Sequence, residues 1–402
     1  MPRRSRSVPL SVALWMILLL AGFASAQSAD STPQKRSTIV YWGQGYGPDS
    51  KGLEATIREF ERRWPQYRVR MLSMGAGRMN PQKLMTSIVG EVPPDLIYQD
   101  RFSLSDWANR GAFMPLDDFI ARDKGKDPYC PNLDEYVPAT VQEATYEGKL
   151  YGIPFGADSR ILYYNKQIFR ENADALRKAG LDPERPPRTW SEVIAYGKVL
   201  TKFDKNGRMI RAGFLPNYGN SWLYLYAFQN NAKFISEDGR RCTLNSPEAV
   251  EALQFMVDGY EAVGGYENAQ KFQSGFRGNE FDPFFIGQVA MKVDGDWILP
   301  GFLRYAPGLD FGVAPAPVPD DRYYRRGRFA NEKDQFVTWV GGFSYAIPRG
   351  AKNADGAWEL IKWLSSAEAR VMEFQAQADW ERRRGREFVP RILANTKANE
   401  QS

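Results

Sequence analysis

The sequence predicts an α/β fold, and two features of its first hundred mature residues predict it. Short apolar segments have the pattern of strands, and between them apolar residues recur at helical spacing. Strands that alternate with helices in this way form sheets with parallel strands and right-handed crossovers. The strands are expected at 38–42, 67–72 and 95–98, and the helices at 53–64 and 81–89.

Each boundary in this region has a local cause. Glycines follow Trp42 and end the first strand, and Pro65 ends the first helix because its ring cannot continue one. Val69 and Met71 alternate with arginines, which is the period of a half-buried strand. Pro81 begins the second helix, which a Pro-Pro pair ends before the third strand.

The middle of the chain continues with larger helices. Residues 189–192 have the Thr-x-x-Glu pattern of a capping box, which begins a helix. Ser246 followed by proline begins another, whose buried stripe is expected to contain Val250, Leu253 and Val257. The remaining elements expected are a strand at 289–293, an extended segment at 311–319, an exposed loop at 320–335, and a last helix from 353–355 with Ala357, Leu360, Ile361 and Leu364 facing inward.

Composition excludes several classes of chemistry. The chain has 402 residues, of which 43% are hydrophobic and 25% charged, as in folded globular proteins. It has no histidine, which excludes Ser-His-Asp and Cys-His nucleophiles and His-ligated zinc. After residues 1–26, 50 basic side chains remain against 48 acidic ones. This near-neutral balance argues against a nucleic-acid partner.

Residues 1–26 have the organisation of a secretory signal peptide. Three arginines precede an apolar run at 10–23, and an Ala-Ser-Ala sequence ends at Ala26. The apolar run is shorter than the ~20 residues that span a bilayer. We expect cleavage after Ala26, a flexible leader at 27–37, and export to a bacterial periplasm; the alternative is an uncleaved N-terminal anchor.

Cys130 and Cys242 are the two cysteines of the chain. An oxidising compartment permits a disulfide between them, and the sequence leaves this open against two separate buried thiols. Two cysteines without histidine do not predict a metal site. The glycines at 75–77 lack the lysine of a P-loop and the third glycine of a dinucleotide fingerprint, so no cofactor is expected.

Aromatic and polar residues follow the predicted strands, where ligands of α/β sheets bind. Flat rings cover the apolar C–H face of a sugar, while charged and amide groups pair with its hydroxyls. The mixture therefore favours a sugar or polyol ligand, although each aromatic residue alone also fits a core position. The residues concerned are Trp42, Gln44, Tyr46, Asp100, Arg101, Asp158, Trp297, Gly341 and Gly342.

Residues 148–155, 162–166 and 186–190 form three segments with characteristic sequences. Taken in order, these segments resemble the extracellular solute-binding proteins of family 1. These are the sugar-binding components of ABC importers, a group that includes maltose-binding protein. The resemblance covers about residues 38–395. It implies a two-lobed periplasmic binding protein fold of the type II kind, with mixed sheets flanked by helices and a ligand cleft between the lobes. Other segments agree with it, among them 287–291 together with 295–297.

The same resemblance implies a function. Such proteins are not enzymes; they act as monomers, close on a sugar or oligosaccharide, and deliver it to the membrane permease. By analogy with the maltose-binding member, Asp100 and Arg101 match a sugar contact, Asp158 an acidic contact and Trp297 a stacking ring. Other contacts implied, by looser alignment, are Trp42, Gln44 and Tyr46 in the first-strand loop, Tyr218, Asn220 and Trp222 in a later loop, and the backbone of Gly341 and Gly342.

The lobes follow from the resemblance too. The first is expected to hold 38–157 and 341–402, and the second 158–340. Family members continue beyond a segment like 388–392 with helices that complete the second lobe, whereas this sequence ends at Ser402. That completing part of the second lobe is therefore expected to be missing.

Two other functions remain open. One is a secreted carbohydrate-active enzyme that uses two carboxylates. The other is a receptor for a different polar solute, such as a phosphorylated polyol, because one fold serves many ligands.

Overall fold

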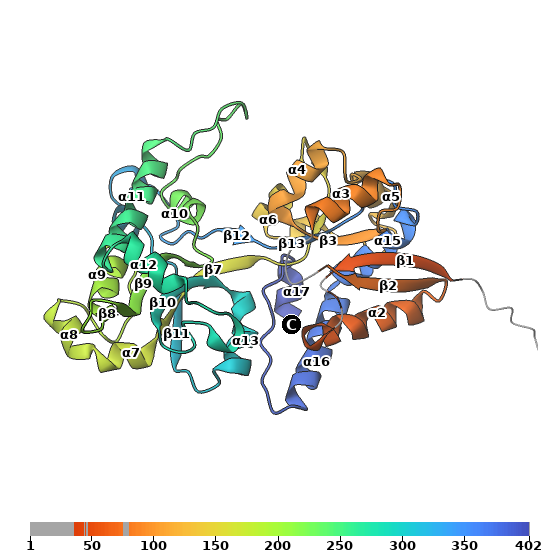
Figure 1. Cartoon of the computed structure of the whole chain (residues 1–402). Helices are drawn as coiled ribbons and strands as arrows, with labels where there is room; N and C mark the ends of the chain where they lie inside the picture. The colour runs from red at the N-terminus through yellow and green to blue at the C-terminus, as the bar shows by residue number, and fades with distance from the viewer. Residues whose placement is uncertain (1–35, 44, 46, 75–79, 402) are drawn as a thin grey trace, which may run out of the picture.

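The computed structural model describes residues 36–43, 45, 47–74 and 80–401. The predicted signal peptide, most of the predicted leader, and two candidate ligand residues, Gln44 and Tyr46, lie outside these residues. None of the described helices is long and apolar enough to cross a membrane. The strands lie mainly in two mixed sheets, each covered by helices (Figure 1).

The first sheet has the strand order β2-β1-β3-β13-β6. β1 (Ser37–Gly43) pairs in parallel with β2 (Tyr67–Ser73) and β3 (Leu96–Asp100), which confirms the predicted parallel arrangement. β13 (Phe343–Ala346) returns from far along the chain and pairs antiparallel with β3 and with β6 (Ile153–Pro154). We call this sheet and its helices the first lobe.

Alternation along β1 directs its side chains to two different cores. Ile39 and Tyr41 face a core that contains Trp358 and Trp363, whereas Trp42 faces the opposite core. The helices of this lobe are α2 (Lys51–Arg63), α3 (Pro81–Val89), α4 (Leu104–Asn109), α5 (Asp117–Asp123), α6 (Pro138–Glu143), α15 (Ala354–Ser365), α16 (Ala367–Arg382) and α17 (Thr396–Gln401), with a small hairpin of β4 (Thr145–Tyr146) and β5 (Lys149–Leu150).

The second sheet has the order β11-β7-β10-β9-β8 and, with its helices, forms the second lobe. β10 runs parallel to β9 and antiparallel to β7. β11 pairs antiparallel with residues 161–165 of β7, and the short β12 pairs antiparallel with Asp158 and Ser159 at its beginning. The strands are β7 (Asp158–Asn165), β8 (Lys202–Phe203), β9 (Met209–Gly219), β10 (Val289–Gly295), β11 (Phe311–Pro315) and β12 (Val340–Gly341).

The capping box of the second lobe forms in part. Thr189 accepts a hydrogen bond from the backbone N–H of Glu192 and so begins α9, while the Glu192 carboxylate accepts from the N–H of Arg188. The helices of this lobe are α7 (Lys166–Glu171), α8 (Ala173–Lys178), α9 (Trp190–Leu200), α10 (Leu223–Gln229), α11 (Pro247–Ala262), α12 (Tyr266–Gln273), α13 (Leu299–Tyr305) and α14 (Asp320–Tyr323).

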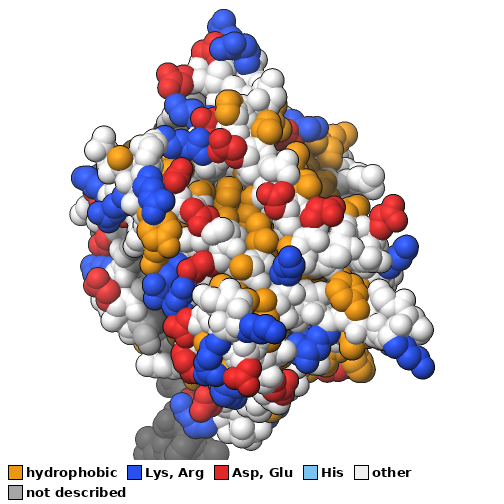
Figure 2. Space-filling model, turned by 90° about the vertical axis from the view of Figure 1, so that its left-hand side faces the viewer, with side chains coloured by type: hydrophobic (Ala, Val, Ile, Leu, Met, Phe, Trp, Pro, Cys, Tyr) orange, Lys and Arg blue, Asp and Glu red, His pale blue; other side chains and the backbone are white. Residues whose placement is uncertain are grey.

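The predicted buried stripe of α11 is wrong. Val250, Leu253 and Val257 are 53%, 49% and 44% exposed. The helix buries its alanine-rich face instead, where small side chains permit close approach and Phe255 stacks on Trp190 at 4.4 Å between ring centroids. Figure 2 shows hydrophobic side chains exposed among charged ones on this end of the molecule.

The segment 320–335 is not simply an exposed loop, as predicted. It contains α14 and a short 3-10 helix (Gly327–Phe329), and both Arg322 and Phe329 are buried. The guanidinium of Arg322 donates to the carbonyl of Gln229 at 2.6 Å, so a charged residue anchors this segment to α10.

The chain passes between the lobes at 154–158 and again at 340–343. A third segment, 391–395, lies beside the first crossing, because Leu393 pairs with Gly156 and the N–H of Ala157 donates to Ile392 at 3.0 Å. Figure 1 shows β7 and β12 leading from one lobe toward the other. We call these three extended segments, 154–158, 340–343 and 391–395, the hinge region.

Candidate functional site

A cavity of about 300 Å³ lies between the lobes. Its walls come from α2, α16 and the segment 386–391 on one side and from α13 on the other. The volume is at the lower end of the range for small-molecule sites. Aromatic residues in the lining are Phe155, Trp297, Tyr305, Phe374 and Phe388; charged ones are Asp49, Glu373, Glu381, Glu387, Arg304, Arg386 and Arg391.

Ion pairs cross this cleft. Arg304 of α13 contacts Asp49 at 2.5 Å and Glu381 at 3.5 Å, both in the first lobe. Glu381 also accepts a hydrogen bond from Arg386 at 2.6 Å. Two of the three arginines in the lining are therefore already neutralised by carboxylates.

Trp297 is positioned by the end of β10. A Cβ atom on Gly295 would lie 1.7 Å from the Trp297 ring, so the ring folds back over a residue that must be glycine. The ring reaches both the cavity and the guanidinium of Arg160, whose carbon lies 4.8 Å from the ring centroid. The candidate stacking residue is thus at the cleft.

Arg160 is held between two tryptophans. Its guanidinium lies 3.5 Å from the Trp339 centroid and donates to Asn220 Oδ1 at 3.0 and 2.9 Å and to the Asp158 carbonyl at 2.7 Å. Burial lowers its pKa to about 10, which still leaves it charged at neutral pH. Sequence reasoning missed Arg160 as a site residue, although it lies two positions after Asp158 on the same strand face.

Asp100 and Asp158 interact across the first crossing. Burial raises the pKa of Asp100, and the nearby charge of Asp158 adds to that effect. Asp100 also accepts from the N–H of Phe102 at 3.1 Å. Arg160 thus contacts Asn220, the Asp158 carbonyl and the Trp297 ring, and of these residues Trp297 lines the cavity.

Other candidate residues lie elsewhere. Trp42 is 7% exposed and packs with Leu84 and Ile97 in the first-lobe core. The Tyr218 hydroxyl donates to Asp282 at 2.9 Å inside the second lobe, and Trp222 is 40% exposed at the start of α10. Sequence spacing placed these residues after strands but did not decide the direction of their side chains.

Arg101 and the two glycines belong to the hinge. Arg101 is fully buried, and its guanidinium donates to the carbonyl of Gly341. The carbonyl of Gly342 accepts from the Arg101 backbone N–H at 3.0 Å. A ligand contact by the Arg101 side chain, which the resemblance implies, does not agree with this placement.

The open disulfide prediction is corrected. Cys130 and Cys242 are free thiols, Cys130 beside the first-lobe core and Cys242 exposed in the second lobe, where its backbone pairs with Ile235. The alternative of two separate buried thiols is also wrong, because Cys242 is exposed and Cys130 is only half-buried.

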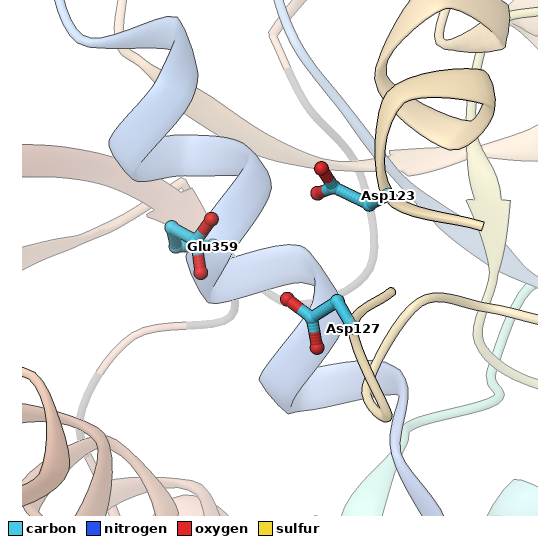
Figure 3. Close-up of side chains that lie close together, drawn as sticks. All are labelled: Asp123, Asp127 and Glu359. Atoms are coloured by element: carbon cyan, nitrogen blue, oxygen red, sulfur yellow. The ribbon is translucent and has the colours of Figure 1, made fainter. Parts of the chain in front are cut away.

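Asp123, Asp127 and Glu359 place carboxylate oxygens within 4.8 Å of one another (Figure 3). The ammonium group of Lys362 lies among them, 2.8 Å from Asp123 and 2.9 Å from Glu359, and bonds to Asp127 as well. This buried lysine supplies the positive charge that a metal ion would otherwise provide.

Comparisons with known proteins agree with this architecture. The family model described as bacterial extracellular solute-binding protein matches residues 45–371. The chain is 24% identical to the maltotriose-binding protein of Pyrococcus abyssi, over 68% of this chain and 51% of that protein. It is 26% identical to the sn-glycerol-3-phosphate-binding periplasmic protein UgpB of Agrobacterium fabrum, over 81% and 70%.

The structure of CpMnBP1 with mannotriose bound is similar to this one, with a TM-score of 0.66 and 26% identity, over 90% of this chain and 84% of that one. The chain spans about half the length of the maltotriose-binding relative. Because the family model covers most of the chain, from the first strand loop to α16, the chain belongs to the bacterial extracellular solute-binding protein family.

Proposed function

We propose that this protein is the periplasmic, non-enzymatic binding component of an ABC importer, and that it encloses a sugar or oligosaccharide between its lobes. The observation that supports this proposal is the cavity between the lobes, whose lining combines aromatic rings with carboxylates and arginines. Closing such a cleft buries the ligand's hydroxyls, and buried hydroxyls without partners are costly, so this arrangement gives selectivity.

The rest of the proposal follows the family. The signal peptide ends at Ala26, the mature protein acts as a monomer, and the closed form docks on the permease subunits. The first lobe comprises 38–157 and 341–402, and the second lobe 158–340. The relatives that support a sugar ligand include the maltotriose-binding protein, an arabinooligosaccharide-binding protein of Bacillus subtilis, and mannotriose-bound CpMnBP1.

A phosphorylated polyol is the second candidate, because UgpB is a comparably similar relative. Charge argues against it. Four carboxylates face three arginines in the cavity lining, and Arg304 and Arg386 are already paired with Asp49 and Glu381. A phosphate would meet a net negative cleft, whereas neutral hydroxyls pair well with carboxylates and arginine.

The test is a thermal-shift and tryptophan-fluorescence screen of the mature protein with maltotriose, mannotriose, arabino-oligosaccharides and glycerol 3-phosphate. A bound ligand raises the melting temperature, because it stabilises the native state. We expect a sugar to do so without any glycoside being hydrolysed. Trp297→Ala is expected to abolish the shift, while Tyr266→Ala, an exposed ring outside the cavity, retains it.

Three results would contradict the proposal. A shift with glycerol 3-phosphate and none with any sugar favours the second candidate. Release of a hydrolysis product favours a carbohydrate-active enzyme. A sugar response that survives Trp297→Ala unchanged places the ligand elsewhere.

A further inference from the structure

Arg101 lies where the crossings between the lobes meet. Its Nη1 donates to the carbonyl of Gly156 at 2.7 Å in the first crossing and to the carbonyl of Phe343 at 2.9 Å in the second. Its Nη2 donates to Gly341, also in the second crossing. One guanidinium therefore joins two segments whose residues Gly156 and Gly341 are 185 positions apart in sequence.

The geometry leaves no room for another use of this side chain. Arg101 is 0% exposed, and its remaining bond runs from Nε to Glu143 at 2.9 Å. Four hydrogen bonds thus engage most of the five N–H donors of a guanidinium. Glu143, at the end of α6, neutralises the charge within the first lobe.

Gly342 shows how closely the segments approach. Its φ is +123°, and a Cβ there would lie 2.6 Å from the carbonyl oxygen of Gly156 and 3.0 Å from Arg101 Nη1. Any side chain would push the two crossings apart and displace the guanidinium. The third segment is tied to the same point, because Leu393 pairs with Gly156.

We propose that Arg101 is a positioning residue that fixes the pivot of lobe closure rather than a ligand contact. The proposal rests on the proposed function, since it assumes that the lobes close on a ligand. A planar guanidinium with donors in several directions can bind three carbonyls and one carboxylate together, which the single ammonium of lysine does not reproduce. With the crossings fixed at one point, the lobes rotate about a defined axis.

The test measures the separation of the lobes without ligand. Spin labels are placed at the native, exposed Cys242 and at Asp118→Cys on exposed α5, in a Cys130→Ser background, and their distance distribution is recorded by pulsed electron resonance. Arg101→Gln is compared with Arg110→Gln, an exposed arginine of the same lobe that forms an ion pair with Asp106. We expect Arg101→Gln to broaden or shift the distribution and Arg110→Gln to leave it unchanged.

Further variants allow the proposal to be tested even if Arg101→Gln does not fold. If Arg101→Gln does not fold, Glu143→Gln and Gly342→Ala disturb the same junction from its two ends and are expected to broaden the distribution. Arg101→Lys is expected to restore only part of the wild-type distribution.

An unchanged lobe separation in folded Arg101→Gln, with loss of ligand affinity alone, would overturn the proposal and return Arg101 to the ligand site. An unchanged separation in both fallback variants would overturn it as well. If instead no ligand is found for the wild-type protein, the proposed function fails while the ligand-free distance measurement still decides the role of Arg101.

Discussion

Asp296 is buried beside the cleft with its two carboxylate oxygens in different situations. Oδ2 accepts from the N–H of Ile392 at 2.9 Å, whereas Oδ1 has no hydrogen-bond partner among the described residues. Burial raises the pKa of this carboxyl, and the charge of Asp158 acts in the same direction. Folding therefore favours the protonated form of Asp296 more than the unfolded chain does.

The sign of the pH dependence follows from this preference. Because the pKa of Asp296 is raised in the folded state, its contribution to the free energy of unfolding is fully present below pH 3.8, the ordinary pKa of the group. That contribution is lost as the pH rises through the raised pKa. Asp296→Asn removes this dependence. We expect the variant to gain stability relative to wild type as pH increases from 3.8 toward neutrality, measured by urea unfolding. A wild-type-minus-variant difference that is constant with pH would contradict this.

At the scale of elements, α15 is attached to α5 and its following loop through Lys362. The Lys362 side chain is 3% exposed, and its ammonium contacts the carboxylates of Asp123, Asp127 and Glu359, whose side chains are 13–26% exposed. Lys362→Met is expected to destabilise the protein by about 3 kcal/mol, because three carboxylates lose their common partner. The free energy of unfolding of each variant is measured by chemical denaturation. The control is Lys352→Met, which changes an exposed lysine just before the same helix.

The corrected face of α11 gives a second prediction at this scale. Leu253→Ser changes an exposed side chain and is expected to alter stability by no more than about 0.5 kcal/mol. Phe255→Ala removes a ring stacked on Trp190 and is expected to cost about 3–5 kcal/mol. If Leu253→Ser destabilised the protein more than Phe255→Ala, the buried face predicted from sequence periodicity would be the correct one.

At the scale of the whole molecule, the ion pairs of Arg304 link α13 to the first lobe across the cleft. Pairs this accessible contribute roughly 0–1 kcal/mol and are screened by salt. Arg304→Gln should therefore shift the lobes toward open forms by at most about fivefold. Small-angle scattering without ligand checks this, and high salt should reduce the difference; Arg177→Gln, far from the cleft, is the control.

Part of the site was predictable and part was not. Trp297 follows a strand end, as expected, and lines the cavity. Asp100, Asp158 and Asn220 do not line it, and their contact with a ligand stays a prediction. The sequence did not foresee the cavity wall from α16 and the segment 386–391, because helical spacing does not identify what faces a helix from another lobe.

The sequence by itself determined the local elements and the family. Prolines, caps and apolar periods act over a few residues, so β1 and α2 were located to within two residues at each end, as was the beginning of α11. The absence of histidine excluded whole classes of chemistry for the same reason: composition needs no coordinates.

Only the tertiary structure decided what each of these residues does. Trp42 turns into a core because the first sheet is covered on both faces, and Arg101 enters the hinge because Gly341, 240 residues later, returns beside it. Such roles depend on contacts between distant segments. No local pattern encodes them, since the same side chain satisfies the same local rules whether it faces ligand, core or hinge.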